Sequence, residues 1–258
     1  MIKTLLLLAL TASSPFAHAD PSLDRLTEIE REYAESDLDA HMDISPAEMA
    51  ARNKELKRVL QGEFDNELLE PGMAMYSEGA RDLFKEFARH PVASYSLRKV
   101  YDPEGRIGFC FGRAMAIHLE LLRAGIDKRS IRKIWAVGDL ALGSLKWHHH
   151  VATMVRASDG GWWVIDPMWE GPMKATQWMF RMRWLFAKWP RLPKLEEPRL
   201  RFFVTRPERF GTELAVKYKR EELFNEESYG SFFKDLMKHN RERPRIERPA
   251  KLARPRLR

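Results

Sequence analysis

Residues 109–124 read FCFGRAMAIHLELLRA, a run that is apolar on nearly every side of a helix. Small residues such as Gly112 allow neighbouring elements to approach closely, and Gly125 marks the end of the helix. Because a helix that is apolar all round is buried, the run predicts a central helix. Cys110 falls in its first turn, where backbone N–H groups and the helix dipole favour a thiolate. That position suits a nucleophile.

Two strand-like runs downstream predict an antiparallel hairpin. The first spans residues 150–156 and the second residues 162–166, and the SDGG segment between them has the composition of a turn. Another strand-like run, residues 133–137, and a glycine-containing loop come before the hairpin. His150 begins one strand and Asp166 ends the other. The hairpin therefore brings two polar side chains near each other.

The length of the hairpin loop decides whether these two side chains share a face. A loop of two or four residues would pair Asp166 with Thr153, whose side chain points away from His150. A loop of three or five residues, or a bulge, would pair Asp166 with Ala152, on the same face as His150. We expect the odd loop or the bulge.

The first residues indicate the compartment. Residues 1–19 read as a secretory signal, with Lys3 before an apolar core and a small-x-small cleavage site ending at Ala19. No later run reaches the roughly 20 apolar residues of a membrane-spanning helix, so we expect a secreted or periplasmic protein. Cys110 is the only cysteine, and a free thiol is a liability in an oxidising compartment unless it has a function. The alternative is a small buried hydrophobe.

The chain outside the central motifs is helical in pattern. Residues 20–90 form a helical arm, which either caps the domain or serves as a removable pro-segment. Within the arm, SPAE at residues 45–48 is a capping box, and residues 75–88 form an amphipathic run. The catalytic domain is predicted to span residues 91–240, with a carboxy-terminal helix near residues 221–238.

The formal net charge is +7, and +6 of it belongs to the carboxy-terminal end. Residues 241–258 contain eight Lys or Arg and two Glu, whereas residues 20–240 have equal numbers of basic and acidic residues. The pattern excludes a basic face on the body and predicts a disordered tail, because the tail has few bulky apolar residues. Such a tail either contacts polyanions or simply aids solubility.

Three consecutive histidines, residues 148–150, resemble a metal cluster only superficially. Neighbouring residues on a strand point to opposite faces, and no cysteine or carboxylate pair lies nearby at zinc-ligand spacing. We therefore expect no metal and no cofactor. His118 is separated from Cys110 by more than two helical turns, about 12 Å of rise, which is too far for a hydrogen bond.

Three short motifs resemble a known family. CFGRA at residues 110–114, HVA at 150–152 and VIDP at 164–167 are similar to the Cys-His-Asp core of the transglutaminase-like superfamily. Within this superfamily, the secreted bacterial protein-glutaminases, which deamidate glutamine side chains in proteins, are the most similar. The resemblance covers about residues 107–169.

This resemblance implies both a fold and a set of roles. The fold is α+β, with a transglutaminase-like or papain-like core in which a central helix bearing the nucleophile packs on a short antiparallel sheet. Cys110 takes the place of the nucleophile, His150 that of the base and Asp166 that of the residue that orients the base. Papain-like relatives have a glutamine shortly before the cysteine as an oxyanion donor. This chain lacks it, and the backbone N–H of Cys110 is the candidate that remains.

The implied function is an exported protein-glutamine deamidase that acts through a thioester. The same triad would serve a transglutaminase if a lysine amine attacked the thioester, or a cysteine peptidase if the substrate were a backbone amide. A binding module without catalytic activity is a further alternative. Trp147 and Trp169 flank the predicted triad and are candidates to bind the substrate side chain, unless they fill the core. Residues 178–189 are expected to form a core helix, and the alternative is an interfacial helix that docks on a membrane or on a protein substrate.

Overall fold

The computed structural model describes most of the chain. The predicted signal segment and residues 244–258 of the predicted tail lie outside the described residues, which are 21–62, 72–103, 108–142, 145–187, 199–213 and 227–243.

The centre of the molecule is an antiparallel sheet of five strands in the order β4-β3-β2-β1-β5. The strands are β1 (Ile131–Leu142), β2 (Leu145–Arg156), β3 (Trp162–Ile165), β4 (Met173–Lys174) and β5 (Leu200–Thr205). β1 and β2 form one long hairpin, so the glycine-containing loop predicted before residue 150 is wrong over most of its length. The register shifts between Val137 and Leu140, at Gly138, where a Cβ atom would lie 1.8 Å from the Arg199 carbonyl oxygen. That glycine forms a bulge inside the sheet and does not end the strand.

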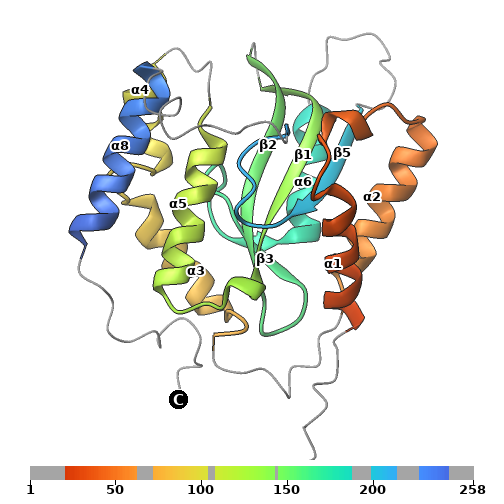
Figure 1. Cartoon of the computed structure of the whole chain (residues 1–258), viewed down its shortest axis with the longest axis horizontal. Coiled ribbons are helices and arrows are strands. Elements are labelled where there is room, and N and C mark those ends of the chain that lie inside the picture. The colour runs from red at the N-terminus through yellow and green to blue at the C-terminus, as the bar shows by residue number, and fades with distance from the viewer. Residues whose placement is uncertain are drawn as a thin grey trace, which may run out of the picture.

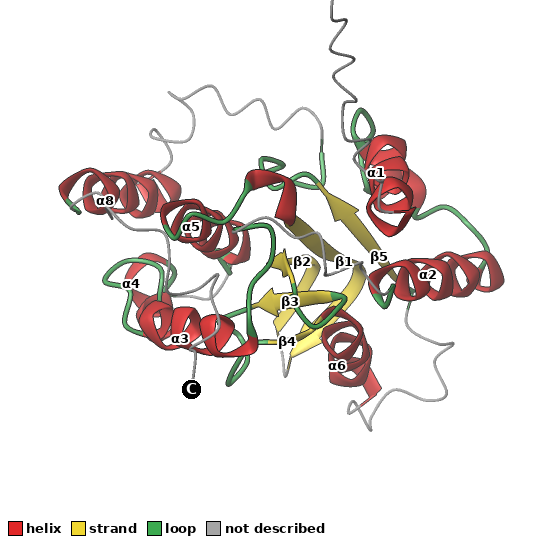
Figure 2. Ribbon diagram, turned by 90° about the horizontal axis from the view of Figure 1, so that it is seen from below, coloured by secondary structure: helices red, strands yellow, loops and turns green. Residues whose placement is uncertain are grey.

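Helices cover both faces of the sheet, which gives the α+β fold that the sequence predicts (Figure 1). Figure 2 shows α3, α4, α5 and α8 on one side of the sheet and α1, α2 and α6 on the other. None of the described helices has the length and apolar character needed to cross a membrane. The helices are α1 (Pro21–Tyr33), α2 (Pro46–Leu60), α3 (Ser77–Ala88), α4 (Arg98–Tyr101), α5 (Cys110–Arg123), α6 (Ala175–Ala187) and α8 (Glu227–Glu242).

The amino-terminal helices belong to the same hydrophobic core as the sheet. The predicted capping box begins α2, where the Ser45 hydroxyl accepts a hydrogen bond of 3.1 Å from the Glu48 N–H. Midway along α2, the Asn53 side chain donates to the Leu200 carbonyl oxygen and accepts from the Phe202 N–H, at 2.8 and 2.9 Å. α2 therefore covers the open edge of β5 and satisfies backbone groups that an edge strand leaves unpaired.

α8 packs against the central helix. A Cβ atom at Gly112 would lie 2.5 Å from the Phe232 ring, so the glycine in α5 allows the close approach that its sequence predicts. α8 continues through Arg241 and Glu242, and the first residues of the predicted basic tail are therefore helical.

Candidate active site

Cys110 is the first residue of α5, in the first turn as predicted. Its side chain is buried, with 8% of the residue exposed. The preceding residue, Phe109, has a left-handed backbone with φ of 47°. α5 is fixed to the sheet where the Thr153 hydroxyl donates a hydrogen bond of 2.6 Å to the Ala114 carbonyl oxygen. This anchor holds the first turn of α5 beside the middle of β2.

The β2–β3 hairpin has the odd loop that the sequence analysis predicts. Five residues, 157–161, connect the strands, and Thr153 lies opposite Ile165. One step further along each chain, Asp166 faces Ala152, two residues from His150 and on the same face of β2. The loop length therefore accounts for the proximity of the two side chains.

Cys110, His150 and Asp166 are all buried and lie next to one another. His150 Nε2 and Asp166 Oδ2 are 2.8 Å apart. The His150 side chain and the Val151 backbone N–H lie close enough to the Cys110 thiol to lower its pKa. Because Nε2 is bound to Asp166, Nδ1 is the ring nitrogen that is available to interact with the thiol. The three residues predicted from the sequence are brought together at one site.

Two further donors hold the Asp166 carboxylate. The Trp178 indole N–H donates to Oδ2 at 2.8 Å, and the Met168 N–H donates to Oδ1 at 3.0 Å. The Trp178 ring also stacks on His150, with centroids 6.0 Å apart and an interplanar angle of 22°. The sequence predicts a core helix that contains Trp178, and Trp178 is buried in α6. The partner of its N–H depends on how α6 packs, so no local sequence pattern predicts it.

The surroundings favour charges on both the thiol and the imidazole. Burial alone would raise the pKa of the Cys110 thiol, but His150, Arg113 and the Val151 N–H outweigh burial and lower it. Burial alone would lower the pKa of His150, but the Asp166 carboxylate and the thiol outweigh burial and raise it. Both shifts act in favour of a thiolate beside an imidazolium, which is the reactive form of a cysteine nucleophile.

Arg113 is a site residue that the sequence analysis did not assign. The side chain is buried one turn after Cys110, and its Nη2 donates a hydrogen bond to the Gly108 carbonyl oxygen. Its guanidinium lies 5.3 Å from the centroid of the Tyr95 ring. An arginine inside an otherwise apolar helix was the available signal, because a charge is rarely buried without a partner.

The tryptophans proposed for substrate binding are half-buried against the core. Trp147 lies on β2 opposite Leu140. The Trp169 N–H donates to the Asp166 carbonyl oxygen at 3.1 Å, and the Arg181 guanidinium lies 5.3 Å from the centroid of a Trp169 ring. This backbone bond closes a turn that begins at Asp166.

The three consecutive histidines have different surroundings. His148 Nε2 lies 2.6 Å from Asp39 Oδ1, whereas the His149 ring lies against Trp135, with centroids 5.9 Å apart. Together with the bond from His150 to Asp166, these contacts follow the alternation of side chains along a strand.

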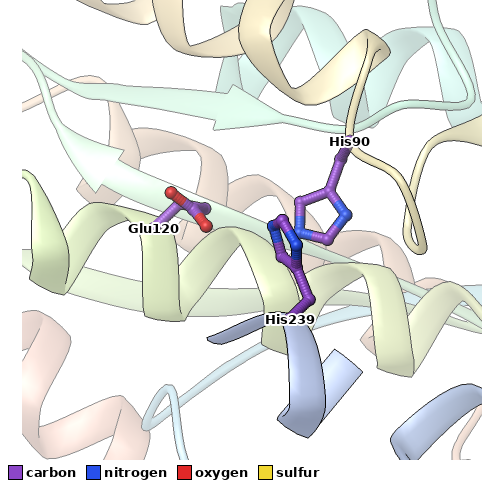
Figure 3. Close-up of side chains that lie close together, drawn as sticks. All are labelled: His90, Glu120 and His239. Carbon is purple, nitrogen blue, oxygen red and sulfur yellow. The ribbon is translucent and has the colours of Figure 1, made fainter. Parts of the chain in front are cut away.

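A separate group of potential metal ligands lies between α3, α5 and α8 (Figure 3). It consists of His90, Glu120 and His239, whose ligand atoms lie within 4.8 Å of one another. His90 Nδ1 accepts two backbone N–H groups, from Val92 and Ala93, so the proton of the neutral ring is on Nε2, the nitrogen left to face a metal. Glu120 Oε1 is bound to Arg243 at 2.5 Å. The arrangement therefore does not fit a metal ion.

The comparisons with known proteins concern the middle of the chain. Residues 80–182 match the model of the glutaminase family, and this segment contains Cys110, His150 and Asp166. The segment resembles glutaminases. This match confirms the likeness to protein-glutaminases seen in the motifs. No curated protein sequence matches the chain.

Solved structures of protein-glutaminases share limited similarity with the chain. Pro-protein-glutaminase is 16% identical, with 71% of this chain and 64% of that chain covered and a TM-score of 0.41. Protein-glutaminase is 18% identical, with 54% and 75% covered and a TM-score of 0.38. The A47Q2 mutant of pro-protein-glutaminase is 19% identical, with 45% of each chain covered and a TM-score of 0.33. The chain thus spans less than two thirds of both pro-forms.

Proposed function

We propose that the protein is a thiol-dependent amide hydrolase that deamidates glutamine side chains in proteins. The observation that carries the proposal is the buried chain from Cys110 through His150 to Asp166, inside the segment that matches the glutaminase family. The order of the groups is that of a nucleophile, its base and the carboxylate that orients the base.

In the first half of the reaction, the Cys110 thiolate attacks the carbonyl carbon of a glutamine side chain. The oxygen becomes negatively charged in the tetrahedral intermediate, near the N–H of Cys110 at the start of α5. The His150 imidazolium then gives its Nδ1 proton to the departing nitrogen. Ammonia leaves, and the acyl group remains on Cys110 as a thioester.

In the second half, water hydrolyses the thioester. Neutral His150 takes a proton from the water, whose oxygen attacks the acyl carbon, and the thiolate leaves. The product is a glutamate side chain, and the thiolate–imidazolium pair is restored. Asp166 keeps the imidazole in one orientation and supports its positive charge in both halves.

The substrate and the location of the enzyme are further parts of the proposal. Trp147 and Trp169 would bind the slim glutamine side chain, and a polypeptide substrate would supply the remaining contacts. Residues 1–19 would direct export, and the amino terminus of the exported protein would then be Asp20. Amino-terminal sequencing of protein recovered outside the cytoplasm tests this processing.

The decisive experiment incubates residues 20–258 with an unfolded, glutamine-rich protein and measures both ammonia and intact mass. Cys110→Ala, with a folded state verified by circular dichroism, is the control. Ammonia release with a small mass gain per site, absent in the control, supports the proposal. Ammonia with crosslinked products identifies a transglutaminase, and fragments without ammonia identify a peptidase. Equal results for both proteins would overturn the enzymatic assignment.

A further inference from the structure

We propose that Asp102 and Arg113 are positioning residues that hold Gly108 between them and thereby fix the backbone from which Cys110 acts. The catalytic half of this inference rests on the proposed function. Its structural half concerns the reactivity of the thiol alone and does not depend on the substrate.

The backbone before Cys110 is strained. Gly108 has φ of 76° and Phe109 has φ of 47°, and Phe109 is the only residue other than glycine with a positive φ in the part of the chain that the structure describes. A bulky side chain in the left-handed region costs free energy, and such a conformation persists only when its surroundings hold it in place. The first turn of α5 therefore needs an external restraint.

Asp102 and Arg113 provide that restraint from two sides. Asp102 Oδ2 accepts a hydrogen bond of 2.7 Å from the Gly108 N–H. The Arg113 guanidinium donates to the Gly108 carbonyl oxygen. Both backbone polar groups of Gly108 are thus held by charged side chains, which form stronger hydrogen bonds than neutral groups do.

Arg113 also brings a positive charge to the site. It is 8% exposed, and burial lowers the pKa of its guanidinium, whereas charges on Cys110 and Asp166 raise it. The charge is buried where it faces a thiolate and a carboxylate, and an interior position strengthens such attractions. Arg113 thus stabilises the Cys110 thiolate while its hydrogen bond restrains Gly108.

This arrangement explains how the site functions without a glutamine before the cysteine. The left-handed turn at Phe109 sets the direction in which the Cys110 N–H points, and that N–H is the candidate oxyanion donor. With the turn fixed in advance, the N–H and the thiol keep the same relative orientation throughout the reaction. The hydrogen bonds to Gly108 would then support a backbone oxyanion donor.

The test measures how fast iodoacetamide alkylates Cys110 as a function of pH. The variants are Arg113→Gln, Arg113→Lys and Asp102→Ala. Arg123→Gln is the matched control, because Arg123 lies at the other end of α5 and pairs with Glu120. Circular dichroism and thermal melting verify that each variant is folded.

Arg113→Gln is expected to raise the apparent pKa of the thiol by about 1, while Arg113→Lys keeps most of the charge effect. In the amide hydrolase assay, all three site variants should lower kcat roughly tenfold or more with little change in KM, because they misplace groups that act in the transition state. Arg123→Gln should change neither quantity.

The inference fails if folded Arg113→Gln gives the same alkylation profile as Arg123→Gln. It also fails if Asp102→Ala retains the kcat of the wild type. If the wild-type protein has no amide hydrolase activity but the alkylation profiles differ as expected, the proposed function is wrong and the positioning role of Arg113 stands.

Discussion

Trp178 and Asp166 are joined by a hydrogen bond of 2.8 Å from the indole N–H to Oδ2, the same carboxylate oxygen that binds His150. One oxygen therefore fixes two rings, and these rings also stack on each other. The carboxylate is fully engaged before substrate arrives, because its other oxygen accepts the Met168 N–H. The orientation of His150 thus depends on α6 as well as on the hairpin.

Trp178→Phe tests this dependence. The phenyl ring keeps the stack on His150 but cannot donate to Asp166, and a hydrogen bond to a charged acceptor contributes about 1.5–3 kcal/mol. We expect kcat/KM for glutamine deamidation to fall roughly tenfold to a hundredfold. Trp135→Phe, which removes an indole hydrogen bond to Thr205 outside the site, is the control. Equal activity of the two variants would contradict the role of the indole N–H.

Asp166→Asn tests the electrostatic role of the carboxylate. The wild-type thiolate–imidazolium pair exists above the lowered pKa of Cys110 and below the raised pKa of His150. Without the carboxylate charge the pKa of His150 falls, the thiol is less stabilised and its pKa rises. The pH profile of kcat/KM should therefore narrow from both sides, and kcat should fall by roughly 10⁴-fold at neutral pH. A loss of rate with an unchanged profile would show that the charge is not what matters.

Local patterns in the sequence were sufficient for the apolar run of α5 and for the capping hydroxyl of Ser45, and the structure confirms both. The odd length of the β2–β3 loop was expected for a different reason, because only an odd loop or a bulge puts Asp166 on the same face as His150, and five residues do connect the strands. Gly138 was interpreted as part of a loop, but it lies inside β1. A glycine is required there because the Arg199 backbone leaves no room for a Cβ atom. Because Arg199 is far from Gly138 in the sequence, no local pattern indicates this contact.

The supporting residues of the site were missed for a related reason. Asp102 and Arg113 were visible as polar residues near the nucleophile, but their shared partner is the backbone of Gly108. A bond from a side chain to the backbone depends on φ and ψ angles, and an unusual backbone at a phenylalanine is not a pattern that composition reveals. The partner of Trp178 likewise follows only from tertiary packing.

Asn53→Leu tests whether the helical amino-terminal arm is part of the folded domain. The substitution removes a donor to the Leu200 carbonyl oxygen and an acceptor for the Phe202 N–H, and both backbone groups would stay buried beneath α2 without partners. We expect the free energy of unfolding to fall by about 2–4 kcal/mol, since each such group costs about 1–3 kcal/mol. Urea denaturation measures this change, with exposed Lys54→Gln as the control on the same helix. A loss below 0.5 kcal/mol, roughly the effect of a surface substitution, would mean that α2 is only loosely attached.

The burial of His90 makes the stability of the protein depend on pH. Burial, followed by the charges of His239 and Arg243, lowers the pKa of His90 from its ordinary 6.5 to about 4. The folded state therefore binds fewer protons than the unfolded state between these two values. The stability contributed by neutral His90 is complete above about pH 6.5 and is lost as the pH falls towards 4, by at most about 3 kcal/mol.

His90→Asn removes this titration and retains a side-chain oxygen that can accept the Val92 and Ala93 N–H groups. The free energy of unfolding of the wild type should therefore fall more steeply than that of His90→Asn between pH 6.5 and 4. The difference between the two slopes corresponds to at most one proton taken up on unfolding. Urea denaturation at several pH values measures the slopes, and the exposed Lys54→Gln is the control, with a slope like the wild type. Parallel curves for His90→Asn and the wild type would show that His90 binds a proton equally well in the folded and unfolded states, which would contradict the lowered pKa.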